Sequence, residues 1–103
     1  MSLEVTWTWA AEVDAQEAFA RLEEFSEGAG VRFTLTLDRL LVVLRRFPLM
    51  AAMWRKPVRR AIIRRSQYGL YYVVEPTRLV VIAVLDLRRD PEKLEAEVLK
   101  RLP

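Results

Sequence analysis

The sequence is organised around three adjoining segments: Val58-Arg-Arg-Ala-Ile-Ile-Arg-Arg65, Tyr68-Gly-Leu-Tyr-Tyr-Val-Val-Glu75 and Leu79-Val-Val-Ile-Ala-Val-Leu-Asp-Leu87. The segments are rich in β-branched and aromatic residues, and Pro76-Thr77-Arg78 supplies a tight turn between the second and the third. We therefore expect three consecutive antiparallel strands. The third segment is apolar on both faces, which indicates a strand in the interior of the sheet.

The residues before these strands predict one more strand and a helical hairpin. Val5, Trp7 and Trp9 alternate with polar residues, as in a strand with one buried face. A helix should follow, ending at Gly28 and Gly30; its apolar stripe is Ala15, Ala18, Phe19, Leu22 and Phe25. Residues from Val31 alternate briefly like a strand, but the longer pattern favours a second helix that ends before Pro48. Its stripe is Phe33, Leu37, Leu40, Leu41, Leu44 and Phe47.

The remaining segments complete an α+β fold. Residues 48–57 show no clean period and are expected to form a connection. Asp90 or a neighbouring residue should cap a last helix, with Pro91 in its first turn and a stripe of Leu94, Val98 and Leu102. The predicted order is an N-terminal strand, a two-helix hairpin, a three-stranded antiparallel meander and a short C-terminal helix. The length suits a single domain over residues 1–103.

The composition excludes several classes of function. The chain has no cysteine, so it can form neither a disulfide framework nor a thiolate metal site. It also has no histidine, the commonest metal ligand and general base. We expect no metal and no cofactor. No apolar run approaches the roughly 20 residues of a membrane span, and residues 1–4 do not begin a secretory signal, so we expect a cytoplasmic protein without a membrane partner.

The charge is distributed unevenly along the chain. Residues 1–30 carry seven acids against one base, whereas residues 31–65 carry ten bases against one acid. A basic stretch of this density is typical of a surface for nucleic acid or for an acidic protein. The alternative is an ordinary solvated helix face and sheet edge.

An ordered set of motifs resembles the RelE/ParE superfamily of toxins. The set consists of the arginine-bearing strand at Val58–Arg65, the tyrosine-containing strand from Tyr68, the hydrophobic strand Leu79–Leu85 and the ending Arg88-Arg-Asp-Pro91. The predicted element order is also that of the superfamily. The resemblance implies the toxin component of a type II toxin–antitoxin system, neutralised by a cognate antitoxin with which it forms a hetero-oligomer.

The resemblance also implies site residues. In the RNA-cleaving members, basic residues on the sheet hold the messenger in the ribosome, and by position Arg64 and Arg88 become candidate catalytic residues. Two guanidinium groups can orient a scissile phosphate and stabilise its developing charge. The expected target-binding residues are Lys56, Arg60, Arg89 and Tyr72. For the tyrosines at 68, 71 and 72, packing across a half-buried sheet is the favoured alternative to stacking on bases.

The sequence departs from the RNA-cleaving pattern in its C-terminal helix. Those nucleases carry a tyrosine or histidine there for proton transfer, but Pro91–Leu102 has neither, and Glu92 or Glu95 would have to substitute. The Arg-Arg-Asp-Pro ending resembles the ParE-like branch better, whose members inhibit DNA gyrase by binding. Three hypotheses remain: a toxin that binds a macromolecular target such as gyrase, a ribosome-dependent mRNA endonuclease, and an inactive remnant that retains only antitoxin binding.

An apolar segment before the strands is the candidate antitoxin surface. Met50, Met53 and Trp54 lie where the superfamily usually has more polar residues. Soft, adaptable side chains beside a tryptophan suit a partner groove. We expect the antitoxin to contribute a C-terminal segment that folds as it docks.

Overall fold

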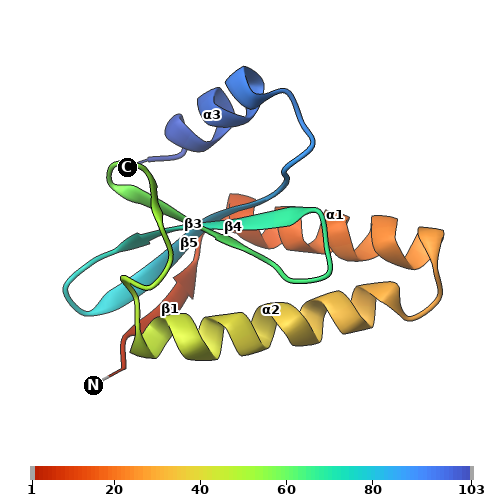
Figure 1. Cartoon of the computed structure of the whole chain (residues 1–103), viewed down its shortest axis with the longest axis horizontal. Helices are drawn as coiled ribbons and strands as arrows, with labels where there is room; N and C mark the ends of the chain where they lie inside the picture. Colours follow the sequence, from red (N-terminus) through yellow and green to blue (C-terminus); the bar gives the residue numbers. More distant parts are fainter. Residues whose placement is uncertain (1, 103) are drawn as a thin grey trace.

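A five-stranded sheet forms the centre of the computed structural model, which describes residues 2–102 (Figure 1). The strands are β1 (Glu4–Trp7), β2 (Met53–Arg55), β3 (Val58–Ile62), β4 (Tyr68–Val74) and β5 (Arg78–Asp86), and the helices are α1 (Trp9–Phe25), α2 (Ala29–Arg46) and α3 (Pro91–Leu99). The predicted α+β fold and its element order are confirmed. None of the helices in residues 2–102 is both long and apolar enough to cross a membrane.

The strands lie in the order β1-β5-β4-β3-β2. β5 lies between β4, which it pairs in antiparallel fashion, and β1, which it pairs in parallel. The expectation of an interior third strand is therefore confirmed. β1 is shorter than β5, however, and their pairing ends at Trp7 and Val81. The C-terminal half of β5 has a strand neighbour on one side only.

A bulge in β5 places two consecutive side chains, Ile82 and Ala83, on the same face of the sheet. The register passes from Tyr72–Val81 directly to Tyr71–Ala83, which leaves Ile82 as the extra residue. Val81 and Val84 pack in the core beneath α1 and α2, whereas Ile82, Ala83 and Leu85 pack on the α3 side. Figure 1 shows this layering, with the helical hairpin on one face of the sheet and α3 on the other. One strand thus contributes to both cores.

Glu23 closes the helical hairpin by capping α2. Its carboxylate accepts hydrogen bonds from the backbone N–H groups of Gly28 (3.1 Å), Gly30 (2.9 Å) and Val31 (3.3 Å). These bonds, that of Gly28 above all, lower the pKa of Glu23 below its usual 4.5. Gly28 has a φ of 83°, in the left-handed region that glycine adopts readily. A glycine pair and one acid therefore fix the turn between α1 and α2.

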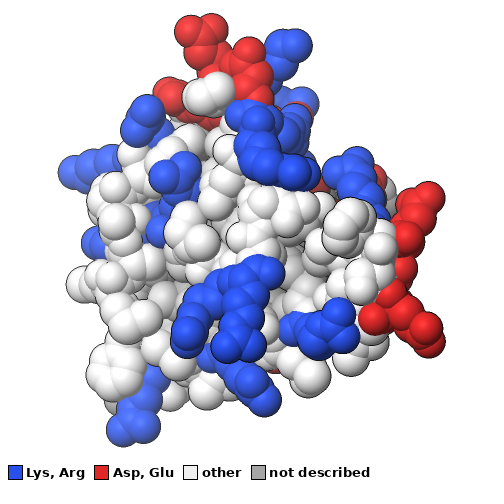
Figure 2. Space-filling model, turned by 45° about the vertical axis from the view of Figure 1, so that its right-hand side comes forward, with Lys and Arg blue, Asp and Glu red and all other residues white. Residues whose placement is uncertain are grey.

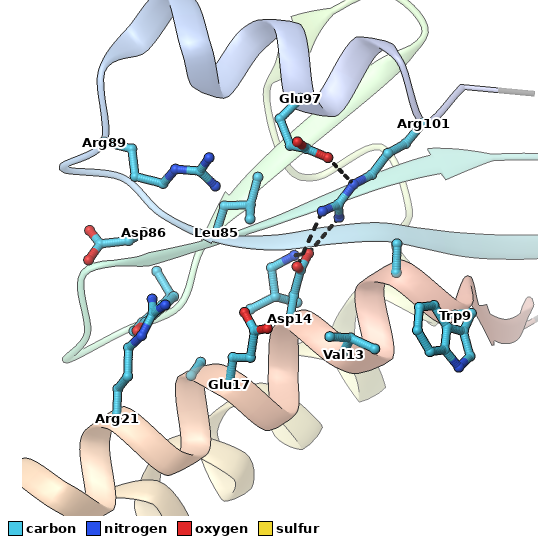
Figure 3. A pocket seen from close by; sticks show the side chains of 14 residues that line it. Trp9, Val13, Asp14, Glu17, Arg21, Leu85, Asp86, Arg89, Glu97 and Arg101 are labelled. Carbon is cyan, nitrogen blue, oxygen red and sulfur yellow. Dashed lines mark hydrogen bonds and ion pairs between the residues drawn. The ribbon is translucent and has the colours of Figure 1, made fainter.

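Asp14 of α1 and Arg101, just after α3, form a buried clamp on the unpaired half of β5 (Figure 3). Arg101 Nη1 lies 2.6 Å from Asp14 Oδ2. The same oxygen accepts the N–H of Val84 at 3.0 Å, and Arg101 Nη1 donates to the carbonyl of Ile82 at 3.0 Å. Glu97 holds the Arg101 side chain from α3, with Nε to Oε2 at 3.0 Å. Two side chains thus satisfy backbone groups that a neighbouring strand would otherwise pair.

Three local expectations were wrong. The connection at residues 48–57 contains the short edge strand β2, which pairs with β3. Trp9 does not continue β1: Thr8 caps α1 by accepting the N–H of Ala11, and Trp9 is the first helical residue, 79% exposed. β3 ends at Ile62, so Arg64 and Arg65 belong to the following turn and not to the strand.

The clamp should contribute strongly to stability. Asp14→Ala leaves the Arg101 guanidinium buried with only part of its partners and is expected to lower the free energy of unfolding by about 3–5 kcal/mol. Denaturant unfolding of the purified protein measures this. Glu75→Ala, which breaks the exposed Arg78–Glu75 pair, is the control and should cost no more than about 1 kcal/mol. Equal small losses in both variants would contradict a structural role for the clamp.

The cap on α2 should depend on pH. Because folding lowers the pKa of Glu23, its stabilisation is fully present above the ordinary value of 4.5 and is lost as the pH falls through the lower folded value. Glu23→Gln should therefore melt at a lower temperature than the wild type at pH 7, and the difference should shrink by pH 3. Glu24→Gln, at the exposed neighbouring position, is the matched control. An undiminished difference at pH 3 would show that the charge of Glu23 is not what matters.

Candidate functional site: an arginine-rich groove

A groove of about 910 Å³ runs between the helical hairpin and the turns that follow β3 and β5. Asp86 is the one acidic residue that lines it among the described residues. Six arginines contribute to its walls: Arg21, Arg32, Arg39, Arg64, Arg65 and Arg88. Figure 2 shows the wider charge pattern, with Lys and Arg spread over one face and the acidic side chains gathered at its margins. We refer to this feature as the arginine groove.

Arg88 is oriented by Asp86. The guanidinium makes two bonds to the carboxylate, Nη2–Oδ2 at 2.8 Å and Nε–Oδ1 at 3.1 Å, and the Arg88 N–H donates to Oδ1 at 2.9 Å. The bonds from Arg88 lower the pKa of Asp86 below its usual 3.8, so the carboxylate is ionised at neutral pH. The Arg88 side chain is nevertheless 73% exposed. The Arg88 guanidinium is therefore fixed in orientation by Asp86 and still accessible to a ligand.

Arg64 and Arg65 reach the groove from the turn between β3 and β4. Ser66 shapes this turn: its hydroxyl donates to the Ile63 carbonyl at 2.7 Å and accepts the N–H of Tyr68 at 3.1 Å. Arg65 has a φ of 61°, a left-handed conformation that costs a non-glycine residue roughly 1–2 kcal/mol. Both arginines are exposed. The turn therefore brings the candidate residue Arg64 into the same groove as Arg88.

The expected target-binding residues do not join this pair. Arg60 points to the α3 side, with its guanidinium carbon 5.9 Å from the centre of the Trp54 ring. Arg89 lines a second cavity of about 650 Å³, which lies between α1, the end of β5 and the C-terminal end of α3 (Figure 3). Lys56 is exposed in the turn between β2 and β3. Tyr72 does not line the arginine groove either. Of the six residues expected to act on the target, only Arg64 and Arg88 therefore lie in the groove.

Tyr72 is buried in the sheet. Its exposed fraction is 0%, and its hydroxyl donates to the Pro48 carbonyl at 2.7 Å. Burial also raises its pKa above the usual 10.0. A side chain with no exposed surface cannot contact a docked macromolecule. We therefore remove Tyr72 from the target-binding set, because tertiary packing uses both its ring and its hydroxyl.

The expected antitoxin-binding residues are partly available. Met50 and Met53 are 61% and 47% exposed, respectively. Trp54 is half-buried, with its ring edge-on to Tyr71 at 5.0 Å and the Arg55 guanidinium carbon 5.3 Å from its centre. The two methionines can therefore contact a partner as the protein stands, whereas Trp54 mainly packs within the fold.

Three arginines of the groove, Arg21, Arg32 and Arg39, were not expected from the sequence. Arg32 and Arg39 are seven residues apart on α2, a spacing that places them on one side of the helix. Arg21 comes from α1, where acidic residues surround it in the sequence. The helical spacing could have grouped the first two, but only the packing of the hairpin against the sheet brings them near Arg64 and Arg88.

The groove is equipped to bind anions but not to transfer protons. Several guanidinium groups around one concave surface suit phosphates or carboxylates. The chain has no histidine, and the one acid in the groove is engaged by Arg88. Tyr68 lines the groove but is only 3% exposed, with its ring against Phe33. Glu92 and Glu95 do not line it, and Glu95 pairs with Arg55 at 3.3 Å.

Comparison with known proteins agrees with this architecture. The family described as ParE toxin of type II toxin–antitoxin system, parDE, matches residues 5–91. Among solved structures, a chain of the chromosomal ParDE TA system from P. aeruginosa has the same fold, with a TM-score of 0.70 and 11% sequence identity. The alignment covers 81% of this chain and 94% of that one. No curated protein matches the sequence. Because the family match spans most of the chain, from β1 to the start of α3, the chain belongs to the ParE family of toxins of type II toxin–antitoxin systems.

Proposed function

We propose that this ParE toxin arrests growth by binding a macromolecular target through the arginine groove, with Arg64 and Arg88 as its principal contacts. The observation that supports this most directly is the meeting of Arg64 and Arg88 in one groove, with Arg88 already oriented by Asp86. Pre-orientation reduces the side-chain entropy lost on binding. DNA gyrase, a cytoplasmic enzyme, is the target that membership of the ParE family implies.

The electrostatics of the groove favour an acidic partner surface. Six guanidinium groups against one carboxylate produce a positive potential that attracts acidic side chains or phosphates and accelerates association. Exposed charges are screened within about 10 Å at 0.1 M salt, so the interaction should weaken as salt rises. Steering of this kind requires no chemical step by the toxin.

A ribosome-dependent mRNA endonuclease is the second candidate. The proximity of Arg64 and Arg88 favours it, since two guanidiniums can stabilise the charge on a phosphate undergoing cleavage. The lack of an available proton donor or acceptor around the groove, in a chain without histidine, argues against it. Binding without chemistry is therefore the better-supported proposal.

Neutralisation by a cognate antitoxin is the other half of the proposal. The exposed Met50 and Met53 offer an apolar contact close to the end of α2. Flexible thioether side chains adapt to a partner that folds as it binds. We infer that toxin and antitoxin form a hetero-oligomer in which this segment is covered.

Two assays distinguish the candidate targets. Purified toxin is expected to inhibit DNA supercoiling by gyrase, and primer extension on messengers after induction is expected to show no new cleavage sites. Toxin bound by its antitoxin serves as the control and should leave supercoiling intact. New cleavage sites together with normal supercoiling would replace the gyrase proposal with the endonuclease one.

Removal of the two groove arginines should abolish toxicity without unfolding the protein. The Arg64→Ala, Arg88→Ala double variant loses two exposed charges, each worth about 0.5 kcal/mol or less to stability, so its melting temperature should stay close to that of the wild type. At matched expression, the double variant should need at least ten times more inducer than the wild type to arrest growth. The measurement is the inducer concentration that halves the growth rate.

A matched control keeps this experiment specific to the groove. Arg78→Ala, Lys93→Ala removes the same charge from exposed positions outside the groove, and Arg78, like Arg88, has an acidic partner close by in the sequence, namely Glu75 three residues before it. This variant should remain fully toxic. If both double variants were equally toxic, the working surface would lie elsewhere on the molecule.

A further inference from the structure

The second cavity, of about 650 Å³, adjoins the arginine groove, because Arg21, Tyr68 and Asp86 line both. One of its walls is α1, and the other is formed by the end of β5, Arg89 and the C-terminal end of α3 (Figure 3). Sites for small molecules have volumes of roughly 300–1,000 Å³, so the cavity is large enough for one. We refer to it as the α1 cavity.

The α1 wall of this cavity is a row of four side chains with different chemistry. Trp9, Val13, Glu17 and Arg21 all line the cavity and follow one another at intervals of four residues, about 6 Å along the helix. The wall therefore changes from aromatic to apolar, then to acidic and then to basic over about 18 Å. Trp9, at the start of the row, is 79% exposed.

Three charged side chains of the cavity have no partner of opposite charge among the described residues. Glu17, Arg21 and Arg89 are exposed, and none of them forms an ion pair. The other charged groups of the lining are already bonded, in the clamp on β5 and in the Asp86–Arg88 pair. In Figure 3 the Arg21 and Arg89 side chains extend from opposite walls toward the end of β5. Two guanidinium groups thus flank one end of the cavity, and a carboxylate lies one helical turn away.

The two guanidinium groups match a phosphate monoester. Their N–H groups pair with phosphate oxygens, and their two positive charges balance the charge of one phosphate dianion. A polyphosphate or a nucleic-acid strand would bring further negative charge against Glu17 and Asp86. An α-amino acid fits less well, because its ammonium and carboxylate groups share one carbon atom whereas Glu17 and Arg21 lie about 6 Å apart along α1.

The remainder of the row matches a nucleoside. The Glu17 carboxylate can accept hydrogen bonds from ribose hydroxyls, as acidic residues do in dinucleotide-binding folds. Val13 and Leu85 supply apolar contacts in the lining, and the exposed ring of Trp9 offers a face on which a base can stack. The order phosphate, ribose and base in a 5′-nucleotide thus corresponds to the order Arg21, Glu17 and Trp9 along the helix.

We propose that the α1 cavity binds a free nucleoside 5′-monophosphate. The phosphate lies between Arg21 and Arg89, the ribose against Glu17 and the base against Trp9. The inference goes beyond the proposed function and does not depend on it. The two sites share Arg21, however, so a bound nucleotide would neutralise one of the six positive charges of the arginine groove.

Titration of AMP into the purified protein tests the site directly. Calorimetry should give a Kd below about 1 mM, and binding should quench tryptophan fluorescence. Inorganic phosphate and adenosine should each bind at least tenfold more weakly than AMP, because each fills only part of the cavity. ATP should bind no more tightly than AMP. Affinity that rose from AMP to ATP would indicate unspecific attraction to arginines and would overturn the proposal.

Substitution of one arginine distinguishes the α1 cavity from the arginine groove. Arg89→Ala should weaken AMP binding at least tenfold. Arg64→Ala is the matched control, since Arg64 is equally classed as exposed and lines the groove but not the cavity, and it should bind AMP like the wild type. Thermal melts should show that both variants are folded. The reverse result, with loss of binding only in Arg64→Ala, would place the nucleotide in the groove and refute the assignment.

Two further positions test the orientation of the nucleotide. Glu17→Ala should abolish a preference for AMP over its 2′-deoxy analogue, whereas Glu24→Ala, at an exposed position of α1 outside the cavity, should retain it. Trp9→Phe should keep most of the affinity but lose most of the fluorescence quenching, and Trp9→Ala should bind at least tenfold more weakly. Absence of AMP binding at ten times the expected Kd, or unchanged binding in Arg89→Ala and Glu17→Ala, would overturn the inference.

Discussion

The buried contact between Asp14 and Arg101 joins α1, β5 and the segment that follows α3 at the part of the sheet that lacks a neighbouring strand. α1 supplies the carboxylate, the residues after α3 supply the guanidinium, and β5 supplies the N–H of Val84 and the carbonyl of Ile82 between them. The sheet needs this contact because β1 ends at Trp7 and leaves half of β5 without a neighbour on that side. An open edge invites pairing with another chain, and a short helix such as α3 buries few residues of its own. The Asp14–Arg101 ion pair both covers the open edge of β5 and holds the segment after α3 against the sheet.

The arginine groove depends indirectly on this arrangement. Asp86 and Arg88 lie at the end of the half of β5 that the clamp protects, and Arg21 lies two helical turns beyond Asp14 on α1. Glu23 fixes the opposite end of the hairpin and thereby the position of Arg32 at the start of α2. Asp14 and Glu23 are thus engaged in bonds within the fold, and Asp86 is the one acidic residue among the described residues that lines the groove. This explains how a chain of net charge +3 presents a strongly basic groove.

Periodicity in the sequence predicted the elements whose burial is regular. β5 was recognised by its two apolar faces and α2 by a stripe that runs from Phe33 to Leu44. β2 was missed because three residues carry no measurable period, and Trp9 was misplaced because the cap at Thr8 overrides the alternation of β1. The sequence predicted Arg64 and Arg88 as a pair, but not Arg21, Arg32 or Arg39, since their proximity arises from packing between distant segments. Asp14 and Arg101, 87 residues apart, likewise have no local signal.

The bulge in β5 has a consequence for how members of the family can vary. Without Ile82, the hydrogen-bonded pairing of β5 with β4 would run without interruption from Val81 to Ala83. All the remaining side chains of β5 would still point to the same faces of the sheet. The extra residue is therefore not needed for alternation; it provides a backbone carbonyl directed at the C-terminal segment, where Arg101 receives it. Loss of Ile82 would remove one of the acceptors of Arg101, which would keep Asp14 and Glu97, whereas loss of Arg101 would leave the Ile82 carbonyl without its partner at the edge of the sheet.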